Sequence, residues 1–270
     1  MELTWKDRPA RIREMGTGPV VVLAHGYPLD GAMWSGVARV LSERFRVLKP
    51  DFPGCGETEA PAEPAIDDFG DFLAAVLAEL PEPRGLAAFS MGGYAALSLV
   101  RRRPELVSAL ALVDTRATAD DDAGRAKRDE AAETARTGGA AAIADAMVPR
   151  LLSADSLKQR DLVERVRRII LRQKVETIVA ELAAMRDRPD SRAALASISV
   201  PTLAVVGDQD ALTPPADSQA IAAAVPGARL VTITGAAHLT PMERPGAVAA
   251  ALGEFFGEAL SAAPADDREP

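Results

Sequence analysis

Ser90 lies at the junction of two segments whose compositions differ. Leu86–Phe89, before it, is a short apolar run long enough for a buried strand, and Met91–Arg103, after it, has the composition of a helix. A strand that turns into a helix within so few residues makes a sharp corner, so small residues must flank the corner. Ala88 and Gly92 stand two positions on either side of Ser90. The pattern is that of a nucleophile elbow with alanine in place of the first glycine, and it predicts a reactive serine; the alternative is a serine that only caps the helix.

A serine needs a base to lose its proton near neutral pH, and histidine is suited to that role. The chain has two histidines. His25 directly follows the apolar run Val20–Ala24 and precedes Gly26, where it could hold a loop. His238 lies in a loop segment near the end of the chain, free to approach a serine from another strand. We therefore assign the base to His238, against the alternative of an ordinary surface histidine.

The base in turn needs an acid that fixes its tautomer and stabilises the imidazolium. Asp210 follows an apolar run after a short turn and is our choice. Asp208 is expected to bond turn amides instead, as aspartate does in turns. Asp114, at the end of the preceding apolar run, is the second choice for the acid.

A carbonyl group that is attacked by a serine develops a negative charge, which backbone N–H groups can stabilise in an oxyanion hole. Met91, the residue after the nucleophile, is expected to supply one N–H. The loop after Ala24 should supply the other, which makes it Tyr27, and Gly26 lets that loop turn tightly. The alternative for this loop is an ordinary turn without a catalytic role.

Composition limits the classes of function. The chain has 270 residues, a net charge of −8 and an isoelectric point near 5.0, which disfavours a nucleic-acid surface. One cysteine, Cys55, permits no intramolecular disulfide and no cysteine metal cluster, and we expect it to be structural. No dinucleotide, phosphate-loop or zinc-protease motif is present, so we expect no cofactor and no metal. The charged N-terminus and the lack of a membrane-length apolar run indicate a cytoplasmic protein without membrane contact.

Short apolar runs, typical of strands, alternate along the chain with segments of helical periodicity. Residues 2–14 read as one or two edge strands, and further strands are predicted at Val20–Ala24, Arg46–Pro50, Leu86–Phe89, Leu106–Val113, Val200–Val206 and Leu230–Ile233. Helices are predicted at Ala32–Arg44, Asp67–Leu80, Met91–Arg103, Ala216–Val225 and Pro245–Leu260. This alternation predicts a mostly parallel sheet covered by helices on both faces, with ligands bound at the carboxyl ends of the strands.

One region interrupts the alternation. Residues 116–196 contain no strand-like run and are rich in Ala, Arg, Asp and Glu at helical period, which predicts a helical insertion broken at Gly138–Gly139, Pro149 and Pro189. The core is then expected from residues 1–115 and 197–261. The polar, proline-bearing tail, residues 262–270, is expected to be disordered.

The motifs in their chain order resemble the α/β-hydrolase superfamily. They are His25–Gly26, Asp51–Gly56, Ala88–Gly92, Gly207–Asp210 and Gly235–His238. The order Ser90, Asp210, His238 is that of α/β-hydrolases. The chain looks most like the bacterial carboxylesterases, the 3-oxoadipate enol-lactonases and the cofactor-free haloperoxidases. The resemblance implies an α/β-hydrolase fold and a helical cap after the sixth strand, at about residues 116–196. The departure is Ala88, while Ser90 argues against the haloalkane dehalogenases, which have aspartate there.

The expected function is cleavage of a small to medium carboxylic ester through an acyl-enzyme. A lactonase acting on an enol-lactone or an acyl-homoserine lactone uses the same steps, and a haloperoxidase uses the same triad, so the residues leave these open. The alternative of another class is a receptor that binds a ligand on the same fold without catalysis. The expected partner is therefore a small ester or lactone, and the sequence does not determine the oligomeric state.

Overall fold

A computed structural model describes residues 1–58 and 64–261. The predicted disordered tail, residues 262–270, lies outside the described residues. The described chain forms an eight-stranded sheet in the order β1-β2-β4-β3-β5-β6-β7-β8. The strands are β1 (Glu2–Trp5), β2 (Arg8–Met15), β3 (Val20–Ala24), β4 (Arg46–Pro50), β5 (Arg84–Phe89), β6 (Ala109–Val113), β7 (Thr202–Gly207) and β8 (Arg229–Ile233).

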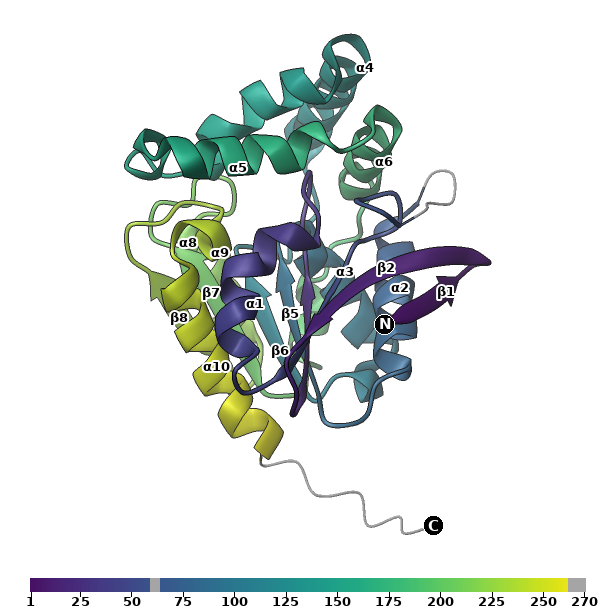
Figure 1. The fold of residues 1–270 in the computed structure, drawn as a ribbon, viewed down its shortest axis with the longest axis vertical. Coiled ribbons are helices and arrows are strands. Elements are labelled where there is room, and N and C mark those ends of the chain that lie inside the picture. The colour runs from purple at the N-terminus through teal and green to yellow at the C-terminus, as the bar shows by residue number, and fades with distance from the viewer. Residues whose placement is uncertain (59–63, 262–270) are drawn as a thin grey trace.

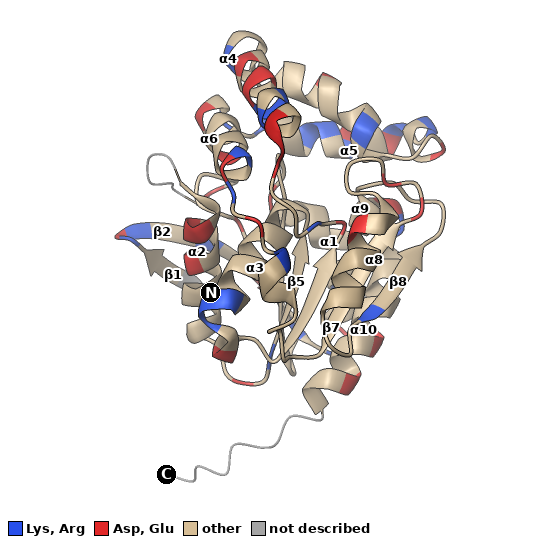
Figure 2. Cartoon of the chain, turned by 180° about the vertical axis from the view of Figure 1, so that it is seen from behind, with Lys and Arg blue, Asp and Glu red and all other residues tan. Residues whose placement is uncertain are grey.

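The sheet is mostly parallel, as the sequence predicts. β1 pairs with β2 and β2 with β4 in antiparallel fashion, and every pair from β4 to β8 is parallel. Strands β3, β6 and β7 contain no charged residue and are buried throughout, as strands covered on both faces require. Figure 2 shows many of the charged residues on the surrounding helices and on the outer β1–β2 ribbon.

Helices cover both faces of the sheet. Helix α1 packs on α10 on one side, and α2 packs on α3 on the other (Figure 1). The helices of the core are α1 (Ser35–Leu41), α2 (Ile66–Ala78), α3 (Met91–Arg102), α8 (Pro215–Ala224), α9 (Thr240–Glu243) and α10 (Pro245–Ser261), with short 3₁₀ turns η1 (Gly31–Trp34) and η2 (Pro104–Leu106). The predicted strand at Leu106–Val113 begins later, at Ala109, because Pro104–Leu106 forms the turn η2.

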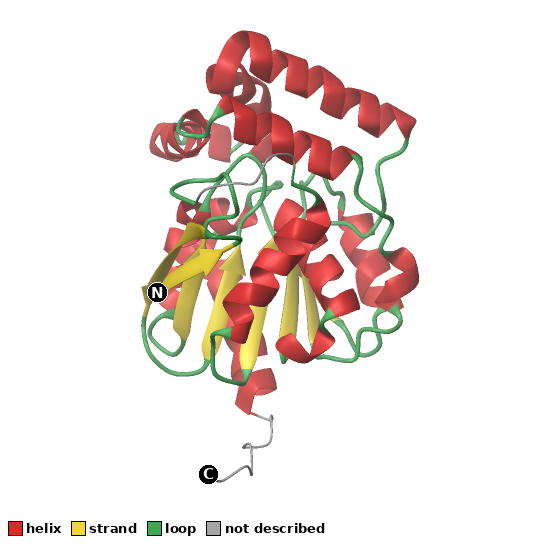
Figure 3. Cartoon of the chain, turned by 90° about the vertical axis from the view of Figure 1, so that its right-hand side faces the viewer, coloured by secondary structure: helices red, strands yellow, loops and turns green. Residues whose placement is uncertain are grey.

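The region after β6 is helical. It comprises α4 (Asp122–Leu151), η3 (Ser156–Lys158), α5 (Arg160–Leu171), α6 (Val175–Arg186) and α7 (Arg192–Leu195). Helices α4, α5 and α6 form a layer beyond the end of the sheet at which the arrowheads of the parallel strands point (Figure 3). We refer to these three helices as the helical layer.

Of the predicted helix breaks, the one at Gly138–Gly139 is present and the one at Pro149 is absent. Gly139 has a φ of 68° and kinks α4, as expected for a glycine within a broken helix. Pro149 does not end α4, which continues to Leu151. A proline in the last turn removes one backbone hydrogen bond without stopping the helix at once, and the buried side chains of Val148 and Leu151 favour the last turn.

In the described part of the chain, every helix is too short or too polar to span a lipid bilayer.

Candidate active site

Ser90 forms the corner between β5 and α3. Its backbone has a φ of 51° and a ψ of −114°, a strained conformation for a residue with a side chain. A Cβ on Gly92 would lie 2.4 Å from the carbonyl oxygen of His25, and one on Gly93 would lie 2.4 Å from Oγ1 of Thr115. Small residues are therefore required after the corner because α3 passes directly against two neighbouring loops.

Ala88 replaces the first glycine of the elbow pattern without disturbing it. It is fully buried in β5, where it pairs with Ala24 of β3 and Leu112 of β6. A hydrogen bond to the neighbouring strand β6 holds the corner, because the N–H of Ser90 donates to the carbonyl oxygen of Val113 at 2.9 Å.

His238 lies within hydrogen-bond distance of Ser90, although 148 residues separate them in the chain. Its Nε2 is 2.9 Å from Oγ of Ser90, and its Nδ1 is 2.8 Å from Oδ2 of Asp210. The imidazole is buried and packs on the ring of Phe89, with centroids 5.1 Å apart. Because an ionised carboxylate only accepts hydrogen bonds, Nδ1 carries the proton and Nε2 is left to accept one from the serine.

Asp210 is held in place by the turn that follows β7. Its Oδ1 accepts the N–H groups of Leu212 and Thr213 at 2.8 and 2.9 Å, and its Oδ2 accepts the hydroxyl of Thr213 at 2.6 Å. Burial disfavours the charged form, but the charge of His238 and the hydrogen bonds from His238 and Thr213 outweigh it and lower the pKa of Asp210 below its ordinary value. The carboxylate is thus ionised and oriented toward the histidine.

Asp208 and Asp114, the other two acids considered from the sequence, form hydrogen bonds with groups other than His238. Asp208 accepts the N–H of Gly235 at 2.9 Å in an exposed turn. Asp114 is fully buried and accepts the N–H of Gly207 and the hydroxyl of Thr240. Burial, reinforced by the charge of Asp210, raises the pKa of Asp114 well above its ordinary value.

The loop after β3 lies against the serine. A Cβ on Gly26 would stand 2.8 Å from the carbonyl oxygen of Phe89 and 3.0 Å from Cβ of Ser90. Tyr27 follows directly, so its backbone is beside the nucleophile. Met91 is the first residue of α3, and the N–H of a first helical residue has no acceptor within its own helix. Met91 thus adjoins Ser90 in the chain, and the residue before Tyr27 packs against Ser90.

His25 holds two loops together and does not contact Ser90 through its ring nitrogens. Its Nε2 accepts the N–H of Phe52 at 2.9 Å, and its Nδ1 is 3.2 Å from the carbonyl oxygen of Gly26. Full burial lowers the pKa of His25, so the ring is neutral. This agrees with its assignment as a loop residue.

Cys55 is buried, and its thiol donates to Oε1 of Glu181 at 3.1 Å. Burial is the main cause that raises the pKa of this thiol well above its ordinary value, and the charge of Glu181 adds to it. A thiol in this state is a poor nucleophile, in agreement with its expected structural role.

Glu243 is a site residue that the sequence did not indicate. Its Oε1 accepts the N–H of Ala237, the residue before the histidine, at 2.7 Å. Its Oε2 accepts the N–H of Ser153, just after helix α4, at 2.8 Å. An acid in a short polar segment gives no signal of such a role, which depends on two backbone groups far apart in the chain.

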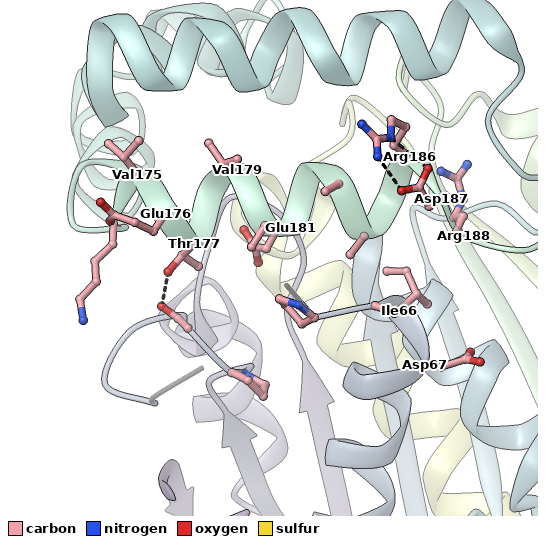
Figure 4. A pocket seen from close by; sticks show the side chains of 18 of the residues that line it. Ile66, Asp67, Val175, Glu176, Thr177, Val179, Glu181, Arg186, Asp187 and Arg188 are labelled. Atoms are coloured by element: carbon pink, nitrogen blue, oxygen red, sulfur yellow. Dashed lines mark hydrogen bonds and ion pairs between the residues drawn. The ribbon is translucent and has the colours of Figure 1, made fainter. Parts of the chain in front are cut away.

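A cavity of about 1310 Å³ runs along α6, between that helix and the loops of the core (Figure 4). Its lining includes Gly54, Ile66, Thr177, Glu181 and Arg188, and none of the three residues Ser90, Asp210 and His238. Among the described residues, no three histidine, cysteine or carboxylate side chains are grouped so that they could hold a metal ion. The expectations of no metal and no cofactor stay predictions.

The family profile described as alpha/beta hydrolase fold matches residues 19–245. A pimeloyl-(acyl-carrier protein) methyl ester esterase of Methylococcus capsulatus is 36% identical over 102 residues, which are 38% of this chain and 39% of that enzyme. This chain thus aligns with 39% of the length of that curated relative.

Two solved structures are similar over nearly the whole chain. A thermophilic esterase from Thermogutta terrifontis, with malate bound, is 34% identical with a TM-score of 0.91, and the match covers 96% of this chain and 98% of that one. The enol-lactonase from Burkholderia xenovorans is 27% identical with a TM-score of 0.88, covering 95% of this chain and 100% of that one. With the profile match over most of its length and this sheet, elbow and strand order, the chain belongs to the α/β-hydrolase fold family.

Proposed function

We propose that this protein hydrolyses carboxylic esters of small to medium size through an acyl-enzyme on Ser90. The observation that supports this best is the continuous chain of hydrogen-bond distances from Ser90 Oγ to His238 Nε2 and from His238 Nδ1 to Asp210 Oδ2. The three residues follow three different strands, β5, β7 and β8. The similar esterase of Thermogutta terrifontis agrees with this function.

In the first half of the reaction, Ser90 Oγ attacks the ester carbonyl carbon while its proton passes to His238 Nε2. The imidazolium is stabilised by Asp210. When the tetrahedral intermediate collapses, the carbon–oxygen bond to the alcohol breaks and the alcohol leaves with the proton from His238. A water molecule then attacks the acyl-enzyme, giving its proton to the same nitrogen, and the acid departs as Ser90 regains a proton.

We assign the stabilisation of the negative charge on the carbonyl oxygen to the backbone N–H groups of Tyr27 and Met91. Both are backbone groups fixed by close packing at Gly26 and Gly92, so they need no rearrangement as charge develops. Residues 116–196, which contain the helical layer, would act as the cap that covers the bound substrate, on the core made by residues 1–115 and 197–261.

A lactone is the second candidate substrate. A lactone is a cyclic ester, so its ring opens by the same steps and leaves the alcohol attached to the acyl group. The observation that favours it is the similarity to the enol-lactonase of Burkholderia xenovorans over 95% of this chain.

The function is tested with p-nitrophenyl esters of graded acyl length alongside a panel of lactones. Replacing Ser90 by alanine should lower kcat by more than about a thousandfold, because the residual rate then comes from binding and the oxyanion hole alone. Ser197→Ala is the matched control, since this serine is exposed and its hydroxyl bonds only a neighbouring carbonyl. Absence of turnover on every ester and lactone by the unmodified protein would instead favour a ligand-binding receptor.

A further inference from the structure

Two consecutive residues of the helical layer bond the same carboxylate of the core. Arg172 and Gln173 form part of the short connection between α5 and α6, and Asp30 caps η1 in the loop after β3. The guanidinium of Arg172 donates to both oxygens of Asp30, from Nε to Oδ2 at 2.6 Å and from Nη2 to Oδ1 at 2.7 Å. The amide of Gln173 donates to Oδ2 at 3.2 Å. The carboxylate thus joins the α5–α6 connection to the loop after β3.

This contact fixes an orientation as well as a distance. The side chain of Asp30 is buried, and its Oδ1 also accepts the N–H of Ala32 at 2.9 Å, so each oxygen accepts two hydrogen bonds. Burial disfavours the charged form, but the hydrogen bonds from Arg172 and Ala32 outweigh it and lower the pKa of Asp30 below its ordinary value. Two parallel hydrogen bonds from an arginine hold a carboxylate in one orientation, which the single ammonium of a lysine does not do.

Asp30 directly follows the turn that contains Tyr27. The N–H of Leu29 donates to the carbonyl oxygen of Gly26 at 2.9 Å and closes this turn. Among the described residues, no backbone carbonyl accepts the N–H of Tyr27, as expected for a group that bonds a substrate oxygen. Gly26, at one end of the turn, lies against Ser90, and Asp30, just beyond the other end, is bonded by the helical layer.

The loop and the helical layer each have further bonds that do not involve Arg172. The N–H of Gly31 donates to Oδ1 of Asp51 at 2.9 Å, which ties the loop to the core. Thr177 of α6 donates to the carbonyl oxygen of Gly54 at 2.8 Å, which ties the helical layer to the core at another point. Replacement of Arg172 should therefore shift the turn without unfolding the loop or releasing the helical layer.

Arg167 provides a matched comparison on α5. It pairs with Asp145 of α4, so both members of this ion pair belong to the helical layer. The exposed fractions of the two arginine side chains are similar, 35% for Arg167 and 44% for Arg172. The two ion pairs differ in what they join, because only the pair of Arg172 reaches the loop that contains Tyr27.

We propose that Arg172 is a positioning residue for ester hydrolysis, which acts through Asp30 to hold the turn where the N–H of Tyr27 meets the carbonyl oxygen of the substrate. This inference rests on the proposed function of Ser90 and on the assignment of the Tyr27 N–H to the oxyanion hole. It makes one half of the oxyanion hole depend on the docking of the α5–α6 connection.

The test compares the kinetics of Arg172→Met and Arg167→Met with p-nitrophenyl butyrate. Complete loss of one oxyanion donor costs about a hundred- to a thousandfold in kcat, so displacement of the Tyr27 N–H should lower kcat about tenfold or more. KM should change less than about threefold, because the ground-state ester has not yet developed the charge that this N–H stabilises. Arg167→Met should keep the kcat of the unmodified protein.

A transition-state analogue distinguishes positioning from a general loss of active protein. The boron of butylboronic acid accepts the oxygen of Ser90 while the serine proton passes to His238, and the tetrahedral adduct carries a negative charge. Its affinity should fall in Arg172→Met by the same factor as kcat/KM. A preparation that only contains less folded enzyme would have a lower apparent kcat and an unchanged inhibition constant.

Two more variants separate geometry from charge. Arg172→Lys keeps the charge without the two parallel hydrogen bonds, so it should also lower kcat and boronate affinity; it carries the test if Arg172→Met does not fold. Asp30→Asn keeps an acceptor for the N–H of Ala32. Combined with Arg172→Met, it should cost no more than the larger single effect, because both changes remove the same contact.

Equal kcat and equal boronate affinity in Arg172→Met and Arg167→Met would overturn the inference and leave the role of Ser90 intact. A lowered kcat with unchanged boronate affinity, or fully additive effects of Asp30→Asn and Arg172→Met, would overturn it as well. An unmodified protein that turns over no ester and binds no boronate would overturn the proposed function together with this inference.

Discussion

The carboxylate of Glu243 joins the histidine loop to the helical layer by bonding the backbone of Ser153. Its other oxygen bonds the N–H of Ala237, directly before His238. A second bond runs in parallel, from the N–H of Leu239 to the carbonyl oxygen of Leu151 at 2.9 Å. The residues on both sides of His238 are thus tied to the end of α4, so the placement of the proposed base depends on the docking of the helical layer.

Glu243→Gln should therefore lower kcat. The amide nitrogen cannot accept a hydrogen bond, so one of the two buried N–H groups loses its acceptor at a cost of about 1–3 kcal/mol. We expect kcat to fall about tenfold or more, with a smaller change in KM, in assays with p-nitrophenyl butyrate. Glu254→Gln is the control, because Glu254 is exposed on α10. An unchanged kcat in a variant with a lowered Tm would mean that Glu243 only stabilises the fold.

The two buried aspartates near the histidine should differ sharply on replacement. Asp210→Asn removes the acceptor that fixes the tautomer of His238, and an amide in this position of a catalytic triad lowers kcat about ten-thousandfold. Asp114→Asn should cost about tenfold at most, because Asp114 bonds Gly207 and Thr240 and not His238, and an amide oxygen can still accept from Gly207. Steady-state kinetics on both variants measure the difference, and the reverse order would make Asp114 the acid.

Gly26→Ala should impair catalysis by crowding the loop beside the nucleophile. The added Cβ would meet the carbonyl oxygen of Phe89 and Cβ of Ser90, which moves the Tyr27 N–H away from the serine. Loss of one oxyanion donor costs about a hundredfold or more in kcat. Gly246→Ala is the matched control, since its Cβ would meet nothing within 4 Å on α10. Equal kcat values for the two variants would remove Tyr27 from the oxyanion hole.

Glu181 should make the stability of the protein depend on pH. In the unfolded chain the group ionises near its ordinary pKa of 4.5, and in the folded protein near 8, so between these values the folded state holds one more proton. The contribution of Glu181 to the free energy of unfolding is fully present below about pH 4.5. It is lost as the pH rises to about 8, by at most about 1.4 kcal/mol per pH unit.

Glu181→Gln does not ionise, so its free energy of unfolding relative to the wild type should rise across the same pH window and level off above it. Urea unfolding of both proteins at several pH values measures the difference. A difference that is constant from pH 5 to pH 8 would show that Glu181 is ionised in the folded protein.

The sequence predicted those site residues that lie just after the end of a strand, because the strand determines where they stand. Ser90 and Asp210 follow the buried strands β5 and β7, and His238 follows the last strand, β8. Parallel strands deliver the residues at their carboxyl ends to one edge of the sheet. Most strands and helices were also placed within a few residues, because apolar runs and helical periodicity report burial directly.

The contacts between the core and the helical layer were beyond the reach of the sequence. Cys55 and Glu181 are 126 residues apart, and Asp30 and Arg172 are 142 residues apart. No local pattern indicates whether an acid will bond a thiol, pair with a guanidinium or stay without a partner. The pairing depends on how whole helices pack against the core. The roles of Glu243 and Arg172 could therefore be found only from the structure.

The central claim is that Ser90 is a nucleophile activated by His238. It is tested most directly by treating the protein with a fluorophosphonate and locating the added mass by peptide mass spectrometry. We predict one phosphonyl group per chain, on the peptide that contains Ser90, with no labelling of the Ser90→Ala protein and strongly slowed labelling of a His238→Ala protein. A protein that stays unlabelled, or that is labelled equally after Ser90→Ala, would contradict the account.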